Sequence, residues 1–154
     1  MISDSGFEIG QERVFDYALV PHLGDWREAG IHREGLEFNH PLLVSAAESH
    51  RGELPSRWSF LQVWGPHVVM SALKPGEEGG AVLRIHEATG LPAHGVEVKL
   101  SVPMASAKEA NLMEDPLLEL PVRDDAIRLD LRPFEIKTIC LQLQRLNETG
   151  VACR

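Results

Sequence analysis

Turn-forming residues recur at short intervals along this chain of 154 residues and restrict it to short elements of secondary structure. Between them, apolar and polar side chains alternate with a period of two, as in a strand with one face in a core and one in water. The clearest case is residues 96–102, where Val96, Val98 and Leu100 alternate with Glu97. This spacing predicts an all-β protein, an antiparallel β-sandwich. The turn-forming residues include Pro21, Gly24, Gly52, Pro55, Gly65, Pro66, Pro75, Gly76, Gly79, Gly80, Gly90, Pro92, Gly95, Pro103, Pro116, Pro121 and Pro133.

Three more segments alternate in the same way. Residues 127–132 repeat the pattern of one apolar and one polar face, and residues 81–86 form a shorter alternating run. In residues 134–143 the alternation changes parity after Thr138. We expect a β bulge near Thr138, because a bulge inserts one extra residue and reverses the faces that follow it.

Two neighbouring segments are apolar on both faces. Residues 57–64 and 67–74 contain few polar side chains, so we expect strands that are covered on both sides. The Gly-Pro pair at 65–66 predicts a turn between them. Trp58 and Trp64 are accordingly expected in the core.

The first third of the chain has a different character. Residues 12–20 alternate like a strand, and another strand is expected to begin near Pro41. Residues 25–37 carry apolar side chains at helical spacing after Asp25, which suits a helix N-cap, so we expect a short helix or an irregular excursion there. A linker is predicted at 48–56. The predicted domains are residues 1–50 and residues 51–154.

Composition and charge exclude several kinds of partner. The net charge of -8 provides no basic face for nucleic acid. No apolar run approaches the ~20 residues of a membrane span, so we expect a soluble protein that does not bind a membrane. The first five residues lack the features of a secretory signal, which favours the cytoplasm. Two cysteines are too few for a disulfide framework, and Cys140 is expected to be a small buried apolar residue.

Six segments resemble blocks of the C-terminal β region of the glycoside hydrolase family 38 α-mannosidases, in family order. Each block is unspecific alone, but six in order cover most of the chain. In one of them His86 stands where an aromatic residue is usual. The segments are 15–24 (FDYALVPHLG), 37–42 (EFNHPL), 59–61 with 68–74 (SFL and VVMSALK), 83–90 (LRIHEATG), 111–114 (NLME) and 133–138 (PFEIKT).

The resemblance implies a chain in two parts, the end of a mutarotase-like large β-sandwich followed by a complete Ig-like terminal sandwich. It also implies a non-catalytic role, in which the chain braces a catalytic region that lies elsewhere. That region would hold the divalent metal, zinc, and no cofactor is expected in this chain. Without the catalytic region we expect an exposed apolar patch or unpaired strand edge in residues 12–47, and a homodimer formed through it.

Several charged residues in these blocks have simple structural roles to play. Glu87 and Glu114 lie at turns, where a carboxylate can accept hydrogen bonds from backbone N–H groups. Glu135 and Lys137 share one face of a strand and can form an ion pair. We therefore expect these residues to stabilise the fold rather than to take part in a reaction.

No catalytic residue and no metal ligand can be assigned from the sequence. A retaining glycosidase needs two carboxyl groups roughly 5 Å apart, and among 23 acidic residues some pair will be close by chance. No spacing among the seven histidines matches a recurrent zinc pattern. The densest group of candidate ligands comprises His22, Asp25, His32 and His40.

Sugar binding is the alternative function, because a β-sandwich can stack a sugar on an exposed aromatic ring. Trp26, with Asp25 and Arg27 beside it, is the candidate for a carbohydrate-binding residue or a domain contact. The chain would then be an independent carbohydrate-binding module for a mannoside or oligosaccharide. A third possibility, a complete small mannosidase, leaves open whether the chain is an enzyme.

Overall fold

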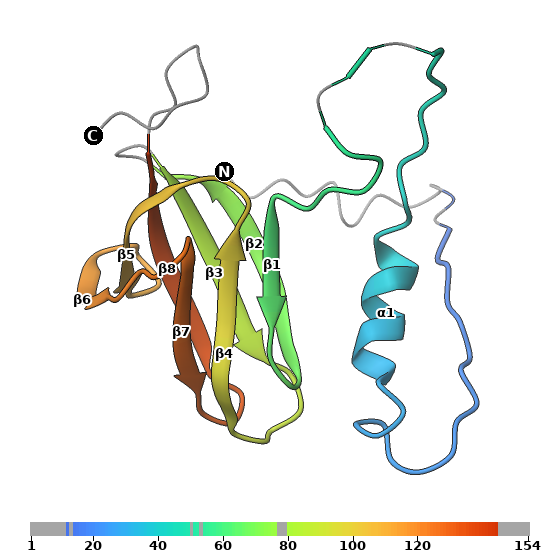
Figure 1. Cartoon of the computed structure of the whole chain (residues 1–154). Helices are drawn as coiled ribbons and strands as arrows, with labels where there is room; N and C mark the ends of the chain where they lie inside the picture. Colours follow the sequence, from blue (N-terminus) through green and yellow to red (C-terminus); the bar gives the residue numbers. More distant parts are fainter. Residues whose placement is uncertain (1–11, 13, 50, 53, 77–79, 145–154) are drawn as a thin grey trace. The chain divides into compact units, whose positions relative to one another are not determined.

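The computed structural model describes residue 12 and residues 14–49, 51–52, 54–76 and 80–144. The chain divides into two compact units, Met1–Ala46 and Ala47–Arg154, and each is described by itself. Within the described residues, the second unit contains eight strands in two antiparallel sheets (Figure 1). The prediction of an all-β antiparallel sandwich is confirmed.

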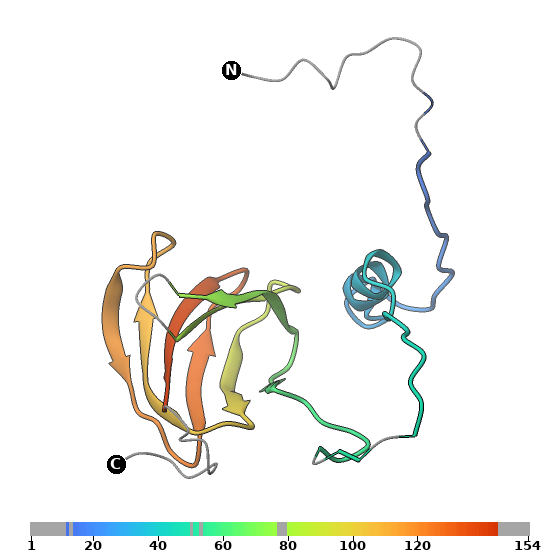
Figure 2. The same cartoon turned by 90° about the horizontal axis from the view of Figure 1, so that it is seen from above.

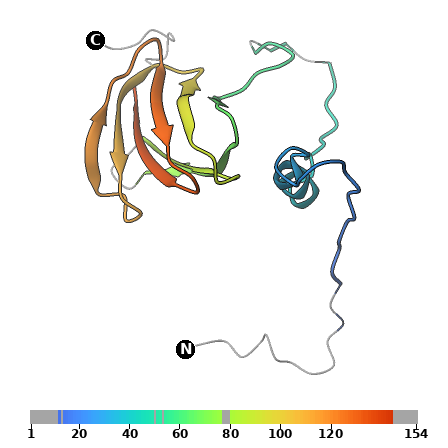
Figure 3. The same ribbon diagram turned by 90° about the horizontal axis from the view of Figure 1, so that it is seen from below.

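The two sheets have three and five strands. The smaller sheet has the order β1-β4-β7, and the larger sheet has the order β2-β3-β8-β5-β6. Seen from above and from below, the strands enclose a common interior (Figures 2 and 3). The strands are β1 (Leu61–Trp64), β2 (Val68–Pro75), β3 (Ala81–Glu87), β4 (Ala93–Leu100), β5 (Met104–Ala110), β6 (Pro116–Leu120), β7 (Ala126–Leu131) and β8 (Ile136–Leu143).

Alternating side chains from both sheets fill the interior. The apolar positions of β4 and β7 point inward, as their period of two predicts, while the polar positions between them face outward. They meet the inward side chains of β3 and β8. Burial of one such side chain contributes about 1.5–3 kcal/mol. Core members include Leu83, Ile85, Val96, Val98, Leu100, Ile127, Leu131, Ile139 and Leu141.

The bulge predicted near Thr138 is wrong. β8 pairs with β3 in unbroken register, with Thr138 opposite Arg84 and Ile139 opposite Leu83. Thr138 points away from the core but is still buried. Its hydroxyl accepts a hydrogen bond from Arg84 Nε at 3.2 Å, and Arg84 also donates to the carbonyl of Leu112. The apparent change of parity arises because both faces of β8 are covered at this point.

The prediction that residues 57–64 and 67–74 are covered on both sides is also wrong. β1 and β2 are edge strands, and the burial of β1 alternates along its length. Trp58 and Trp64 are therefore not core residues, since their exposed fractions are 49% and 48%. Leu61 and Val63 supply the side chains of β1 that pack against the core.

The first unit differs from the predicted strands. The described residues between 12 and 20 form no strand, and residues 41–46 form none either. Alternation alone does not make a strand when no neighbouring backbone is present to pair with it. The assignment of this unit to the end of a larger sandwich stays a prediction.

The helix of the first unit, α1 (Ile31–Asn39), begins later than predicted. Asp25 Oδ1 accepts hydrogen bonds from the backbone N–H groups of Arg27 and Glu28 at 2.8 and 3.0 Å, as an N-cap does. Gly30 then adopts a left-handed conformation with φ of 67°. This conformation interrupts the turn that Asp25 opens, so the helix starts at Ile31.

Candidate functional site

Two turns at one end of the larger sheet are joined by the carboxylate of Glu87. This residue ends β3 and is 1% exposed. Its Oε1 accepts hydrogen bonds from the backbone N–H of Thr89 at 2.7 Å and from the Thr89 hydroxyl at 2.5 Å. Its Oε2 accepts from the N–H groups of Gly90 at 2.6 Å and Phe134 at 3.0 Å. One buried carboxylate thus satisfies donors from chain segments 47 residues apart.

The second turn, residues 132–135, also makes backbone hydrogen bonds. The N–H of Glu135 donates to the carbonyl of Arg132 at 3.0 Å and closes a tight turn, while the N–H of Glu87 donates to the carbonyl of Glu135 at 3.0 Å. Phe134 adopts a positive φ of 58° in this turn. Its ring lies so close to Gly90 that a Cβ there would be 2.6 Å from Phe134 Cζ. We name these residues, Glu87, Thr89, Gly90, Phe134 and Glu135, the Glu87 cluster.

The environment of Glu87 keeps its carboxylate ionised. Burial alone would raise the pKa, but hydrogen bonds from Phe134, Thr89 and Gly90 outweigh it and lower the pKa to about 2. A general acid needs the opposite shift, toward neutral pH. Glu87 is therefore a structural acceptor, and its predicted role is confirmed.

A second charged group surrounds Lys137 of β8. Its Nζ lies 3.9 Å from Glu135 Oε1, which confirms the predicted pair, and it makes a shorter contact of 2.6 Å with Glu109 Oε1. Burial would raise the pKa of Glu135, but hydrogen bonds from Arg132 and the charge of Lys137 lower it. Lys137 is thus shared by two half-buried carboxylates, and Arg132, whose Nη2 lies 3.0 Å from Glu135 Oε1, supplies the second positive charge.

Glu114 does not have its predicted role. Within the described residues, its carboxylate contacts the side chains of Lys74 and Arg84 rather than backbone N–H groups. The acceptor for the loop backbone is Asn111, whose Oδ1 receives hydrogen bonds from the N–H groups of Met113 and Asp115 at 2.8 and 3.0 Å. An amide oxygen can close such a turn as well as a carboxylate can.

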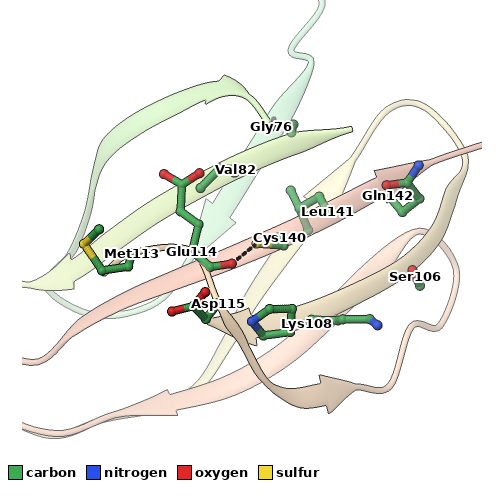
Figure 4. Close-up of a pocket in the computed structure, with 12 residues that line it drawn as sticks. Gly76, Val82, Ser106, Lys108, Met113, Glu114, Asp115, Cys140, Leu141 and Gln142 are labelled. Atoms are coloured by element: carbon green, nitrogen blue, oxygen red, sulfur yellow. Dashed lines mark hydrogen bonds between the residues drawn. The ribbon is translucent and has the colours of Figure 1, made fainter. Parts of the chain in front are cut away.

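The loop that contains Glu114 covers a cavity of about 440 Å³ on the outer face of the larger sheet. Figure 4 shows Glu114 and Asp115 above the sheet, with Lys108 and Cys140 among the lining residues. The thiol of Cys140 donates to the carbonyl of Glu114 at 3.8 Å. Cys140 is half-buried, whereas the sequence predicted that it would be buried. Lys108 and Glu114 are already engaged in ion pairs, with Glu119 and Lys74 respectively. Two of the charged side chains that line the cavity are therefore held by ion pairs.

The Glu87 cluster brings together two of the six segments that resemble family 38 blocks, 83–90 and 133–138. Residues 67–139, which contain the whole cluster, match the family described as the glycosyl hydrolases family 38 C-terminal beta sandwich domain. The second unit of this chain carries the family 38 C-terminal β-sandwich.

Relatives of known name support the same assignment. The chain is 34% identical over 140 residues to human Alpha-mannosidase 2C1 and 33% identical over 152 residues to the mouse protein of that name. These alignments cover 84% and 92% of this chain. The chain spans only 13% and 14% of the length of those relatives.

Outside the region of the family 38 match, the structure brings the three predicted sugar-binding residues together. Arg27 Nη1 lies 3.4 Å from Asp25 Oδ2, and Arg27 Cζ lies 4.5 Å from the centroid of the Trp26 ring. Hydrogen bonds from the N–H of Glu28 and from Arg27 lower the pKa of Asp25. Trp26 is 38% exposed, and the His32 ring meets it edge-on. Sugar binding at Trp26 stays a prediction.

His22, Asp25, His32 and His40, the densest group of candidate ligands in the sequence, form no cluster of metal ligands in the part of the chain that the structure describes. Nowhere in that part of the chain do three His, Cys, Asp or Glu side chains gather as metal ligands would. No helix found there has the length and apolar character that a bilayer crossing requires.

The outer face of the smaller sheet carries a group that the sequence analysis missed. Trp64 of β1 lies opposite Glu97 of β4, which in turn lies opposite Arg128 of β7. Arg128 Nε and Nη2 contact Glu97 Oε2 at 2.8 and 2.7 Å. The signal was present in residues 61–64, where Gln62 and Trp64 alternate with the two inward residues.

Proposed function

We propose that this chain is a non-catalytic C-terminal β-sandwich region of an α-mannosidase-like glycoside hydrolase, and that it braces the catalytic region of that enzyme. The observation that carries the proposal is the contrast between its two units. The second unit closes an apolar core of its own, whereas the first leaves many large apolar side chains exposed. The exposed residues include Val14, Phe15, Tyr17, Leu19, Leu23, Leu42, Leu43 and Val44.

Exposed apolar side chains at this density favour a protein contact. Scattered single residues of this kind are normal on a surface, but grouped ones mark interaction sites. Covering them gains about 25 cal/mol for each Å² removed from water. The proposed partner is the catalytic region, which also holds the divalent metal, zinc, in this proposal.

The test of the bracing role uses the whole chain with a separately expressed family 38 catalytic region from the same genome. We expect the two to co-elute in size-exclusion chromatography with light scattering, and Leu19→Asp together with Leu43→Asp to abolish the complex. Leu118→Asp is the matched control, because Leu118 is also an exposed leucine but lies in the second unit. A complex that survives the double substitution, or no complex at all, would contradict the proposal.

The chain alone is expected to form a homodimer through the same segment. Two copies can cover each other's apolar side chains when no other partner is present. The weight-average mass should rise with concentration and return to that of a monomer in the Leu19→Asp and Leu43→Asp variant. A strict monomer at all concentrations would argue against this part of the proposal.

The non-catalytic role has a direct test as well. The chain should show no turnover of an aryl α-mannoside, with or without added zinc. Turnover that survives repurification and is lost on substitution of one carboxylate would favour a small mannosidase instead.

An independent carbohydrate-binding module is the second candidate. The contact of Arg27 and Asp25 with the half-exposed Trp26 favours it, because an indole with charged groups beside it can stack a sugar and bind its hydroxyls. This candidate requires measurable mannoside affinity that Trp26→Ala abolishes.

A further inference from the structure

Three side chains on neighbouring strands cross the outer face of the smaller sheet in one row. Residues directly opposite each other in an antiparallel pair share a face, so the pairs Trp64–Glu97 and Glu97–Arg128 place all three side chains on the same side. Their sequence neighbours Val63, Val98 and Ile127 point into the core. Because successive side chains of a strand point to opposite faces, the three side chains of the row point away from the core. Trp64 is 48% exposed. The fold thus holds an indole beside a carboxylate on a sheet face.

The carboxylate of Glu97 is held in place with one oxygen still able to accept hydrogen bonds. Arg128 Nε donates to Oε2 at 2.8 Å, Nη2 lies 2.7 Å from the same oxygen, and within the described residues no hydrogen bond reaches Oε1. An exposed ion pair of this kind contributes little to stability. Its effect here is to orient a hydrogen-bond acceptor beside Trp64.

The next row supplies further polar groups. Gln62 of β1 lies opposite Lys99 of β4, and both are exposed. Adjacent strands lie about 5 Å apart, and residues of one face follow each other at about 7 Å along a strand. The hydroxyls at the rim of a ring stacked on Trp64 therefore come within reach of Glu97 and Gln62.

We propose that this face binds one pyranose ring of a glycan, with Trp64 as the stacking surface and Glu97 and Gln62 as partners of its hydroxyls. A sugar ring combines an apolar C–H face with a polar rim, and this combination matches an indole set among a carboxylate and an amide. A protein partner would be expected to meet more than one large apolar side chain here, and the net charge of -8 disfavours a nucleic acid backbone. The inference is independent of the bracing role and of Trp26.

The test titrates the full chain with methyl α-mannopyranoside, an α-linked mannobiose and a β-linked glucose disaccharide. Binding is followed by isothermal titration calorimetry and by tryptophan fluorescence. We expect saturable binding of at least one sugar, a loss of affinity of at least about tenfold in Trp64→Ala, and a smaller loss in Glu97→Gln. Trp64→Phe should retain most of the affinity, because it keeps an aromatic face.

Trp58→Ala is the matched control, since Trp58 is equally exposed but lies outside the sheet. Circular dichroism confirms that each variant is folded. The inference is overturned if the unmodified chain binds none of the three sugars, or if Trp64→Ala leaves the affinity unchanged. It is also overturned if only Trp26→Ala removes binding, or if Trp64→Ala weakens only the complex with the catalytic region.

Discussion

At the scale of single residues, the carboxylate of Glu87 couples two turns. We expect Glu87→Gln to lower the free energy of unfolding by about 3 kcal/mol, because the amide turns a donor toward backbone N–H groups that lose their acceptor in a buried site. Urea denaturation of the two proteins measures the difference. Glu119→Gln is the control, since its exposed pair with Lys108 should contribute less than about 1 kcal/mol. Equal effects of the two substitutions would contradict the structural role of Glu87.

The same residue predicts how stability depends on pH. The pKa of Glu87 is lowered to about 2 in the folded chain from an ordinary 4.5, so the unfolded state binds more protons between these values. The contribution of Glu87 is complete above pH 4.5 and is lost as the pH falls toward 2. It amounts to about 3 kcal/mol at most, since one unit corresponds to about 1.4 kcal/mol. Denaturation at pH 6 and pH 3 should show a smaller loss of stability in Glu87→Gln than in the unmodified chain.

The sequence was sufficient to predict that Glu87 accepts hydrogen bonds, because a carboxylate before Thr89 and Gly90 can reach their N–H groups locally. The contribution of Phe134 could not be predicted, since it depends on a contact across 47 residues. Trp64 was assigned to the core because its neighbours are apolar. The alternation of Gln62 and Trp64 with Leu61 and Val63 carried the signal that Trp64 faces outward, but four residues are too few to separate this pattern from a strand that is covered on both faces.

At the scale of elements, the turn after β3 requires Gly90 for two separate reasons. Its φ is positive, at 78°, and a Cβ would collide with the Phe134 ring. Gly95 has a similar φ of 66° but open space around it. We expect Gly90→Ala to destabilise the sandwich by about 0.5–1.5 kcal/mol more than Gly95→Ala, because only the first forces the exposed Phe134 ring out of its preferred rotamer in addition to the cost of a left-handed backbone. Thermal unfolding of both variants tests this, and equal melting temperatures would argue against the contact.

The elements that were predicted well are those whose faces differ in polarity. β4 and β7 alternate strictly and lie with one face in the core, so their pattern specifies both strand and orientation. β5 (MASAKEA) was missed, because alanine and lysine carry little strand preference. β6 was missed as well, because it is short and begins with a proline at the edge of the sheet.

At the scale of the whole molecule, the core cluster lies entirely within the second unit. We therefore expect residues 47–154 to fold without the first unit, with a melting temperature within a few degrees of the main transition of the full chain. Circular dichroism should show a cooperative transition in both. A shortened chain that aggregates or lacks such a transition would mean that the first unit is needed for the sandwich to fold.

The place of β8 in the larger sheet has a consequence for how the protein is synthesised. It is the last described strand in sequence, but it lies between β3 and β5 at the centre of the sheet. While the ribosome is still making residues 136–143, no strand pairing joins the hairpin of β2 and β3 to the hairpin of β5 and β6. The larger sheet therefore cannot close, and its strand edges stay exposed, until β8 has left the exit tunnel.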